Sequence, residues 1–298
     1  MNSHDDMHEH SLAADLSAML KLASDRRQTL RWLLAGASAL PVLGCGGGSA
    51  SDDTSTTTSV AAATPVVTTT TTPTAPVATT PTGSCSGMPE ETGGPYPGDG
   101  TNSNNGAVVN VLTQSGGVRS DIRSSFNGAT GIAPGVPLTI KLQIVNTDGN
   151  CATLEGYAVY LWHCTQDGLY SLYSSGVTNQ NFLRGVQAAD SNGSVTFQSI
   201  FPGCYAGRVP HVHFEIYPTL AKSSSAASRI KTSQFTFPVA TCNEVYATSG
   251  YSASVRNMAQ ISLSTDMVFS DGYALQMGTV TGNATDGYVV TLTVGLAA

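Results

Sequence analysis

Alternating apolar and polar positions along the second half of the chain predict β-strands. Residues 138–145 read Leu-Thr-Ile-Lys-Leu-Gln-Ile-Val and end in a cluster of turn residues at 146–149. Because successive side chains of a strand point to opposite faces, this alternation is typical of a strand with one buried face. Similar patterns occur at residues 157–164, 194–200, 211–217, 232–237 and 288–294. Since no segment carries a long helical repeat, we predict an all-β protein, a β-sandwich of about seven or eight strands with long loops.

One turn predicts how two strand segments pair. The residues Ser191, Asn192 and Gly193 suit the positive φ angles of a tight turn. This turn separates the apolar stretches 186–188 and 195–197. We therefore expect these two stretches to lie side by side as a β-hairpin.

The first 45 residues have the pattern of an export signal. Arg26 and Arg27 precede an apolar run at 32–43, which is followed by Gly44 and Cys45. A membrane span takes about 20 apolar residues, so this run is too short to cross a bilayer but suits a signal-peptide core. The arginine pair is typical of the twin-arginine signal, which exports folded proteins. We predict an exported protein, located in the periplasm or at the cell surface.

The end of the signal and the residues after it predict a tether. Residues 42–45 read Val-Leu-Gly-Cys and resemble a lipoprotein box, which predicts a lipid on Cys45; cleavage of a plain signal peptide nearby is the alternative. Residues 46–84 consist mainly of Gly, Ser, Thr, Pro and Ala, a composition too poor in apolar surface to fold. If Cys45 carries a lipid, this disordered linker would hold the domain at 85–298 near a membrane.

Charge and cysteine usage narrow the classes of function. Charged residues make up 11% of the chain and the formal net charge is −7, so the chain has no basic stripe that would bind nucleic acid.

Five cysteines follow the linker, an odd number, so at least one is unpaired or bonded to another chain. No pair has the CxxC spacing of a thiolate zinc site. The five are Cys85, Cys151, Cys164, Cys204 and Cys242.

A candidate metal site lies around His211 and His213. On a strand, residues two apart share a face at a spacing of about 6.6 Å, so both imidazoles can reach one ion. Tyr205 stands between turn residues just before them, and Tyr170 follows the turn at 166–168. Ferric iron suits two phenols and two imidazoles because it lowers the phenol pKa from its usual value of about 10.

Copper or zinc on the same histidine pair is an alternative interpretation. Such a site needs further histidines, and His163 is the one other histidine in 85–298. The shortage favours tyrosine oxygens as the remaining ligands.

Several motifs, in order along residues 85 to about 237, resemble the intradiol ring-cleavage dioxygenase family. The stretch Glu91-Thr-Gly-Gly-Pro-Tyr-Pro97 resembles the opening motif of the family's catalytic domain. Residues 162–164 and 167–171 resemble the segment with the first tyrosine ligand, and residues 182–187, 195–197 and 201–205 resemble the approach to the second. Gly207-Arg-Val-Pro-His-Val-His213 matches the histidine signature.

The resemblance implies a role for each residue that matches a motif. Tyr170, Tyr205, His211 and His213 would bind Fe(III). Tyr205 would give way when substrate binds and accept a proton from it, and Arg208, oriented by Gln234, would stabilise charge on the ring. The implied reaction cleaves a catechol-type ring between its two hydroxylated carbons with O2 and gives a muconate-type diacid, the iron acting as Lewis acid and template.

Two departures from the family pattern leave substrate and assembly open. Only five residues separate Tyr205 from His211, whereas the best-known members have a longer loop there, so we expect a more open site. The helical dimerisation region of catechol-cleaving members has no counterpart in the first third of the chain, so the sequence predicts no oligomeric state.

The alternative function is that of a non-catalytic exported lipoprotein. Such a protein would bind a partner through its β-sandwich and would keep only a vestigial metal site. Arg208 and Gln234 argue against this alternative, because packing does not require them.

Overall fold

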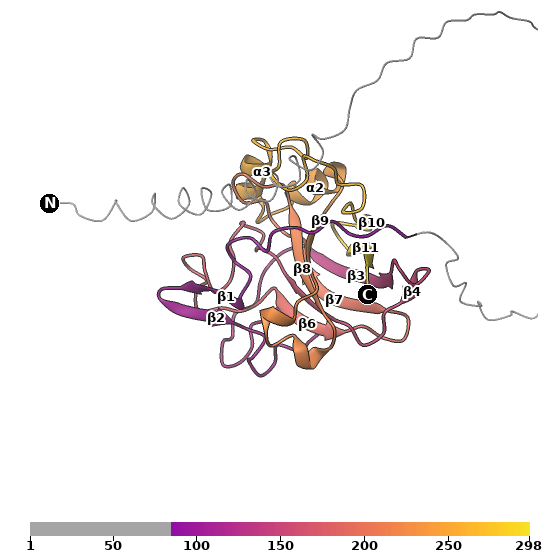
Figure 1. Ribbon diagram of the computed structural model, residues 1–298. Coiled ribbons are helices and arrows are strands. Elements are labelled where there is room, and N and C mark those ends of the chain that lie inside the picture. The colour runs from indigo at the N-terminus through magenta and orange to yellow at the C-terminus, as the bar shows by residue number, and fades with distance from the viewer. Residues whose placement is uncertain (1–84) are drawn as a thin grey trace, which may run out of the picture. The chain divides into compact units, whose positions relative to one another are not determined.

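The computed structural model describes residues 85–298 (Figure 1). The predicted signal, the lipoprotein box with Cys45 and the linker at 46–84 lie outside the described residues, and these stay predictions. Every helix in the described domain is too short or too polar to cross a membrane.

The domain is a sandwich of two β-sheets, as the alternating pattern predicts. One sheet has five strands and the other has four. The first contains β3 (Pro137–Asn146), β4 (Ala152–Thr153), β7 (Ser194–Ile200), β10 (Thr279–Asn283) and β11 (Gly287–Leu296). The second runs in the order β6 (Arg184–Ala188), β5 (Ala158–Trp162), β8 (His211–Tyr217) and β9 (Lys231–Thr236). A separate antiparallel pair, β1 (Asp99–Asn104) and β2 (Ala107–Asn110), precedes them.

The core lies between the two sheets and explains the alternation. Strand β3 buries Leu138, Ile140, Leu142 and Ile144 and turns the residues between them outward. These side chains share one apolar cluster with alternate residues of β8, namely Val212, Phe214 and Ile216. Burying each such side chain contributes about 1.5–3 kcal/mol relative to leaving it exposed. The other face of β8 is buried as well, and it carries His211 and His213.

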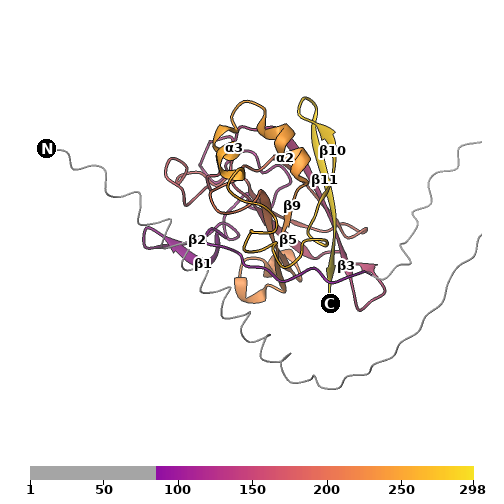
Figure 2. The ribbon, with the colours of Figure 1, turned by 90° about the horizontal axis from the view of Figure 1, so that it is seen from above.

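Helices follow the last strand of the four-stranded sheet. The helices α2 (Val239–Tyr246) and α3 (Ser252–Met258) lie side by side at one end of the sandwich, as Figures 1 and 2 show. Two short 3-10 turns, η1 (Leu220–Lys222) and η2 (Ala226–Ser228), connect β8 to β9. Ser254 of α3 accepts a hydrogen bond from the Cys204 amide at 2.9 Å, and Asn257 donates one to the Cys204 carbonyl at 2.7 Å. The helical segment therefore fixes the chain directly before Tyr205.

The predicted hairpin of 186–188 and 195–197 is wrong. The turn forms, because Asp190 accepts hydrogen bonds from the amides of Asn192 and Ser194 at 2.8 and 2.9 Å. However, β6 pairs with β5 in one sheet, whereas β7 pairs with β3 in the other. The turn residues fix the reversal of the chain but not the sheet that each strand joins. Val195 and Phe197 enter the common core opposite Leu142 and Ile140, which places β7 beside β3.

One disulfide and three free thiols account for the five cysteines of the domain. Cys85 bonds to Cys151 across a sequence separation of 66 residues. Cys164, Cys204 and Cys242 are free and buried. Burial raises the pKa of the Cys204 thiol to about 12 and raises the pKa of the other two thiols too. These thiols are therefore packing groups rather than nucleophiles.

Candidate metal centre

Sheet register brings the candidate residues of three strands together. His213 of β8 lies opposite Trp162 of β5 on one side and opposite Gln234 of β9 on the other. The indole ring of Trp162 stacks on the His213 imidazole, with ring centroids 4.9 Å apart and planes 5° from parallel. This contact fixes the plane of the imidazole.

The two histidines direct their Nε2 atoms at one another. His211 Nδ1 lies 2.6 Å from the Val209 carbonyl oxygen. Because a carbonyl only accepts, Nδ1 carries the proton and Nε2 of the neutral ring keeps its lone pair. That Nε2 is 3.0 Å from Nε2 of His213. Burial, followed by the charge of Arg208, lowers the pKa of His211 to about 3, and burial lowers the pKa of His213 as well, so both rings are neutral near pH 7.

The two tyrosines reach the same point from two loops that touch. The Tyr170 hydroxyl lies 3.3 Å from His211 Nε2, and the Tyr205 ring centroid is 5.6 Å from that of Tyr170 and 5.7 Å from that of His211. Gly168 packs against the Tyr205 backbone with φ of +83°, and a Cβ there would lie 3.1 Å from the Tyr205 Cα. A side chain at this position would be strained, so glycine suits this approach. The four side chains predicted as ligands therefore lie together, while their role as ligands stays a prediction.

Tyr170 and Tyr205 differ in their surroundings. Tyr170 is fully buried, and Tyr205 is partly exposed on its loop. Burial raises the pKa of Tyr205 to about 12, against the opposing charge of Arg208, and burial raises the pKa of Tyr170 strongly. A bound cation would reverse these shifts by stabilising the phenolates.

The predicted arginine and glutamine form a buried chain beside the ligands. Arg208 Nη2 donates to the Gln234 side-chain oxygen at 2.8 Å, and Gln234 Nε2 donates to the Thr92 carbonyl at 2.7 Å. The opening motif of the domain thus contacts the site through Thr92. A residue that the sequence reasoning missed, Asp266, forms a buried ion pair with Arg208 Nε at 3.0 Å. Its one sequence signal is an acidic residue directly before the apolar run at 267–269.

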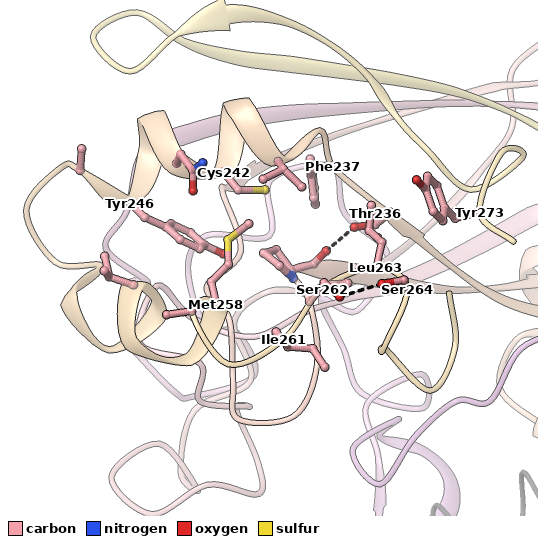
Figure 3. Close-up of a pocket in the computed structure, with 17 residues that line it drawn as sticks. Thr236, Phe237, Cys242, Tyr246, Met258, Ile261, Ser262, Leu263, Ser264 and Tyr273 are labelled. Carbon is pink, nitrogen blue, oxygen red and sulfur yellow. Dashed lines mark hydrogen bonds between the residues drawn. The ribbon is translucent and has the colours of Figure 1, made fainter. Parts of the chain in front are cut away.

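The described domain also has an apolar cavity of about 680 Å³, whose lining residues are drawn in Figure 3. Val209 and Pro210, which link Arg208 to His211, form part of its wall. Most of the remaining wall comes from β9, α2, α3 and the loop after α3, including Phe237, Tyr246 and Met258. The cavity lining does not include the four candidate ligands.

Comparisons with known proteins agree with this fold. A family model described as "Dioxygenase" matches residues 116–222. Chlorocatechol 1,2-dioxygenase of Rhodococcus opacus is 35% identical over 72 residues, which are 24% of this chain and only 27% of that relative. An intradiol ring-cleavage dioxygenase structure from Tetranychus urticae superposes with a TM-score of 0.54 at 23% identity, covering 71% of this chain and 95% of that one. A second dioxygenase structure gives a TM-score of 0.53 at 23% identity, with 71% and 94% covered.

The shared sandwich is therefore the fold of ring-cleaving dioxygenases. The chain is similar to the intradiol ring-cleavage dioxygenase family in its fold and over the residues that the family model matches.

The donor set fits the non-haem Fe(III) that this family generally uses. Within 85–298, no group of three or more His, Cys, Asp and Glu side chains could hold a metal, and the two tyrosines lie beside the two imidazoles of this centre. His163 cannot serve as a third imidazole, because Cys164 and Ser199 occupy its two nitrogens at 2.8 and 2.6 Å. Two neutral imidazoles and two phenols are a suitable set for a hard, highly charged ion.

Proposed function

We propose that the protein is an Fe(III) dioxygenase that cleaves a catechol-type ring between its two hydroxylated carbons with O2 and gives a muconate-type diacid. The observation that carries the proposal is the convergence of Tyr170, Tyr205, His211 and His213, with Arg208 beside them. These four residues would hold the iron, which when bound supplies Lewis acidity and a template for both catechol oxygens.

Tyr205 is the tyrosine best placed to take up a proton. Its loop position leaves it partly exposed, whereas Tyr170 is enclosed. With a pKa of about 12 when not bound to metal, its oxygen would be a strong base once displaced from a cation. We infer that the Tyr205 oxygen accepts a proton from a catechol hydroxyl as substrate enters.

Arg208 supplies positive charge at the ring. It is fully buried, and its Nη1 atom has no hydrogen-bond partner within the described domain. A preorganised donor in a dry site stabilises charge that develops on the substrate. Gln234 holds the neighbouring nitrogen and so restricts the rotation of the guanidinium group.

The location of the reaction is a second part of the proposal. The twin-arginine pattern at Arg26 and Arg27 and the box ending in Cys45 favour an exported, lipid-anchored protein that meets catechol-like aromatics outside the cytoplasm. The disulfide between Cys85 and Cys151 supports this location, because such bonds persist in oxidising compartments.

The test combines a visible spectrum with a product assay. The purified protein, loaded with ferric iron, should show a broad tyrosinate band that shifts when catechol is added without oxygen. Admitting O2 should then consume oxygen and yield the diacid in equal amounts. Tyr170→Phe should weaken the band and lose turnover, whereas Tyr273→Phe, at an exposed tyrosine outside the centre, should change neither.

A colourless protein after iron loading would contradict the ligand set. A coloured protein that binds catechol but consumes no O2 would instead favour the non-catalytic binding module.

A further inference from the structure

We propose that Asp266 is a positioning residue that holds Arg208 in the orientation required for ring cleavage; this inference rests on the proposed function. Asp266 lies in the loop between α3 and β10, outside the residues that the family model matches. Its carboxylate is fully buried.

Both oxygens of the Asp266 carboxylate are engaged by the site and by its own loop. Oδ2 accepts hydrogen bonds from Arg208 Nε at 3.0 Å and from the Val209 amide at 2.8 Å. Oδ1 lies 3.2 Å from Arg208 Nε and accepts from the amides of Val268 at 2.8 Å and Phe269 at 3.3 Å. The backbone of the loop thus fixes the carboxylate, and the carboxylate fixes the arginine.

The arginine is held at two of its three nitrogens. Asp266 binds Nε and Gln234 binds Nη2, so the plane of the guanidinium group is determined. The remaining nitrogen, Nη1, is buried and unpartnered within the described residues. A buried donor without an acceptor is rare in folded proteins and calls for an explanation, such as a catalytic role or a bound water or ion. Gln234, which holds Nη2, lies opposite His213 in the sheet, so Arg208 is held beside the candidate metal centre.

The same carboxylate also supports His211 through one peptide unit. Asp266 binds the Val209 amide, and the Val209 carbonyl accepts from His211 Nδ1 at 2.6 Å. Asp266 therefore connects the arginine that would stabilise charge with the backbone that sets the tautomer of a ligand. Tertiary contact alone brings it there, since its sequence separation from Arg208 is 58.

The kinetic test uses Asp266→Asn, which keeps the size of the side chain but removes its charge. We expect kcat to fall by up to about 100-fold, the loss that a misplacement of about 1 Å can cause, with KM changed less than kcat. In an Arg208→Ala background the same substitution should have little further effect, because the residue it positions is gone. Asp148→Asn, at an exposed turn, is the matched control and should leave kcat unchanged.

The second readout is NMR of the arginine side chain in the iron-free protein. The Arg208 Nε–H signal, assigned by its loss in Arg208→Lys, should exchange slowly with water in the wild type and rapidly in Asp266→Asn. Asp266→Glu keeps the carboxylate and should therefore keep part of the protection of Nε–H against exchange with water. This variant is measured in place of Asp266→Asn if Asp266→Asn does not fold.

The kinetic and NMR outcomes distinguish failure of this inference from failure of the proposed function. If the loss in kcat persists undiminished in the Arg208→Ala background, or if Arg208 Nε–H is unprotected in the wild type, Asp266 does not act by positioning Arg208. If the wild type cleaves no catechol, both the proposed function and the catalytic role of Asp266 are wrong. The NMR result would still show whether Asp266 holds the arginine.

Discussion

Burial sets the protonation state of every histidine in the described domain. The pKa of His163 falls to about 4 and that of His211 to about 3, and His213 shifts in the same direction. Desolvation of the charged imidazolium is the largest cause in each case. A neutral imidazole at neutral pH is the form that binds metal, so His211 and His213 need no proton removed before an ion enters.

We expect the burial of His163 to make the stability of the protein depend on pH. Its ring is buried and neutral, with its nitrogens 2.8 Å from the Cys164 carbonyl and 2.6 Å from the Ser199 hydroxyl. The unfolded chain binds a proton at this residue below a pKa of about 6.5, whereas the folded chain does so only near 4. The free energy of unfolding should therefore fall as pH drops from 6.5 to 4, with at most about 3 kcal/mol from this residue.

Denaturant unfolding of the iron-free protein between pH 7.5 and 4.5 checks this prediction. His163→Gln keeps a hydrogen-bonding side chain but cannot titrate, so its unfolding free energy should decline less steeply than that of the wild type. His211 and His213 contribute equally to both proteins. Parallel pH dependences would show that His163 is not the cause.

At the scale of elements, the sequence predicts strands better than their partners. The predicted bounds of β7 and β8 agree with the structure, because each strand buries one face in the common core. Short strands such as β4 and β10 are not predicted, because they lack a strong apolar pattern. The sequence also does not predict the partners of β6 and β7, because turn residues carry no information about which sheet a strand joins. The candidate histidines follow from local spacing, and the candidate tyrosines follow from the neighbouring turns and the family resemblance. Asp266, by contrast, reaches Arg208 only through the folded loop after α3.

We expect the disulfide between Cys85 and Cys151 to make a measurable contribution to the free energy of unfolding. The bond joins Cys85, before the first strand, to Cys151 in the turn between β3 and β4, and closes a loop with a sequence separation of 66. Chain-entropy arguments give about 4 kcal/mol for a loop of this size. Replacing both cysteines by serine should lower the unfolding free energy by roughly this amount.

The matched measurement adds a thiol reductant to each protein. Reductant should lower the melting temperature of the wild type to near that of the double variant and leave the variant unchanged. A similar drop in the variant would instead implicate the buried thiols of Cys164, Cys204 and Cys242.

At the scale of the whole domain, the centre draws on segments that are far apart in the sequence. Thr92 binds Gln234, Trp162 stacks on His213, and Asp266 holds Arg208. The candidate site therefore depends on both ends of the domain, and it forms only when the domain is folded. A route that exports the folded protein would allow the metal to bind in the cytoplasm first.

This dependence leads to a prediction about export of the full chain. In a bacterium with twin-arginine transport, Arg26→Lys together with Arg27→Lys should retain the protein in the cytoplasm. Cys45→Ala should be exported but recovered from the soluble fraction rather than from the membrane, because it lacks the residue that would carry the lipid.

The redox state of Cys85 and Cys151 shows in which compartment the protein is located. Cys85 and Cys151 should be resistant to thiol alkylation in the wild type and in Cys45→Ala, and accessible in the retained arginine variant, because the cytoplasm keeps thiols reduced. Arg256→Lys, a conservative change in α3, is the control and should match the wild type in both location and alkylation. If the paired arginine variant is exported like the wild type, the twin-arginine interpretation is wrong; if Cys45→Ala stays in the membrane fraction, Cys45 is not the anchor.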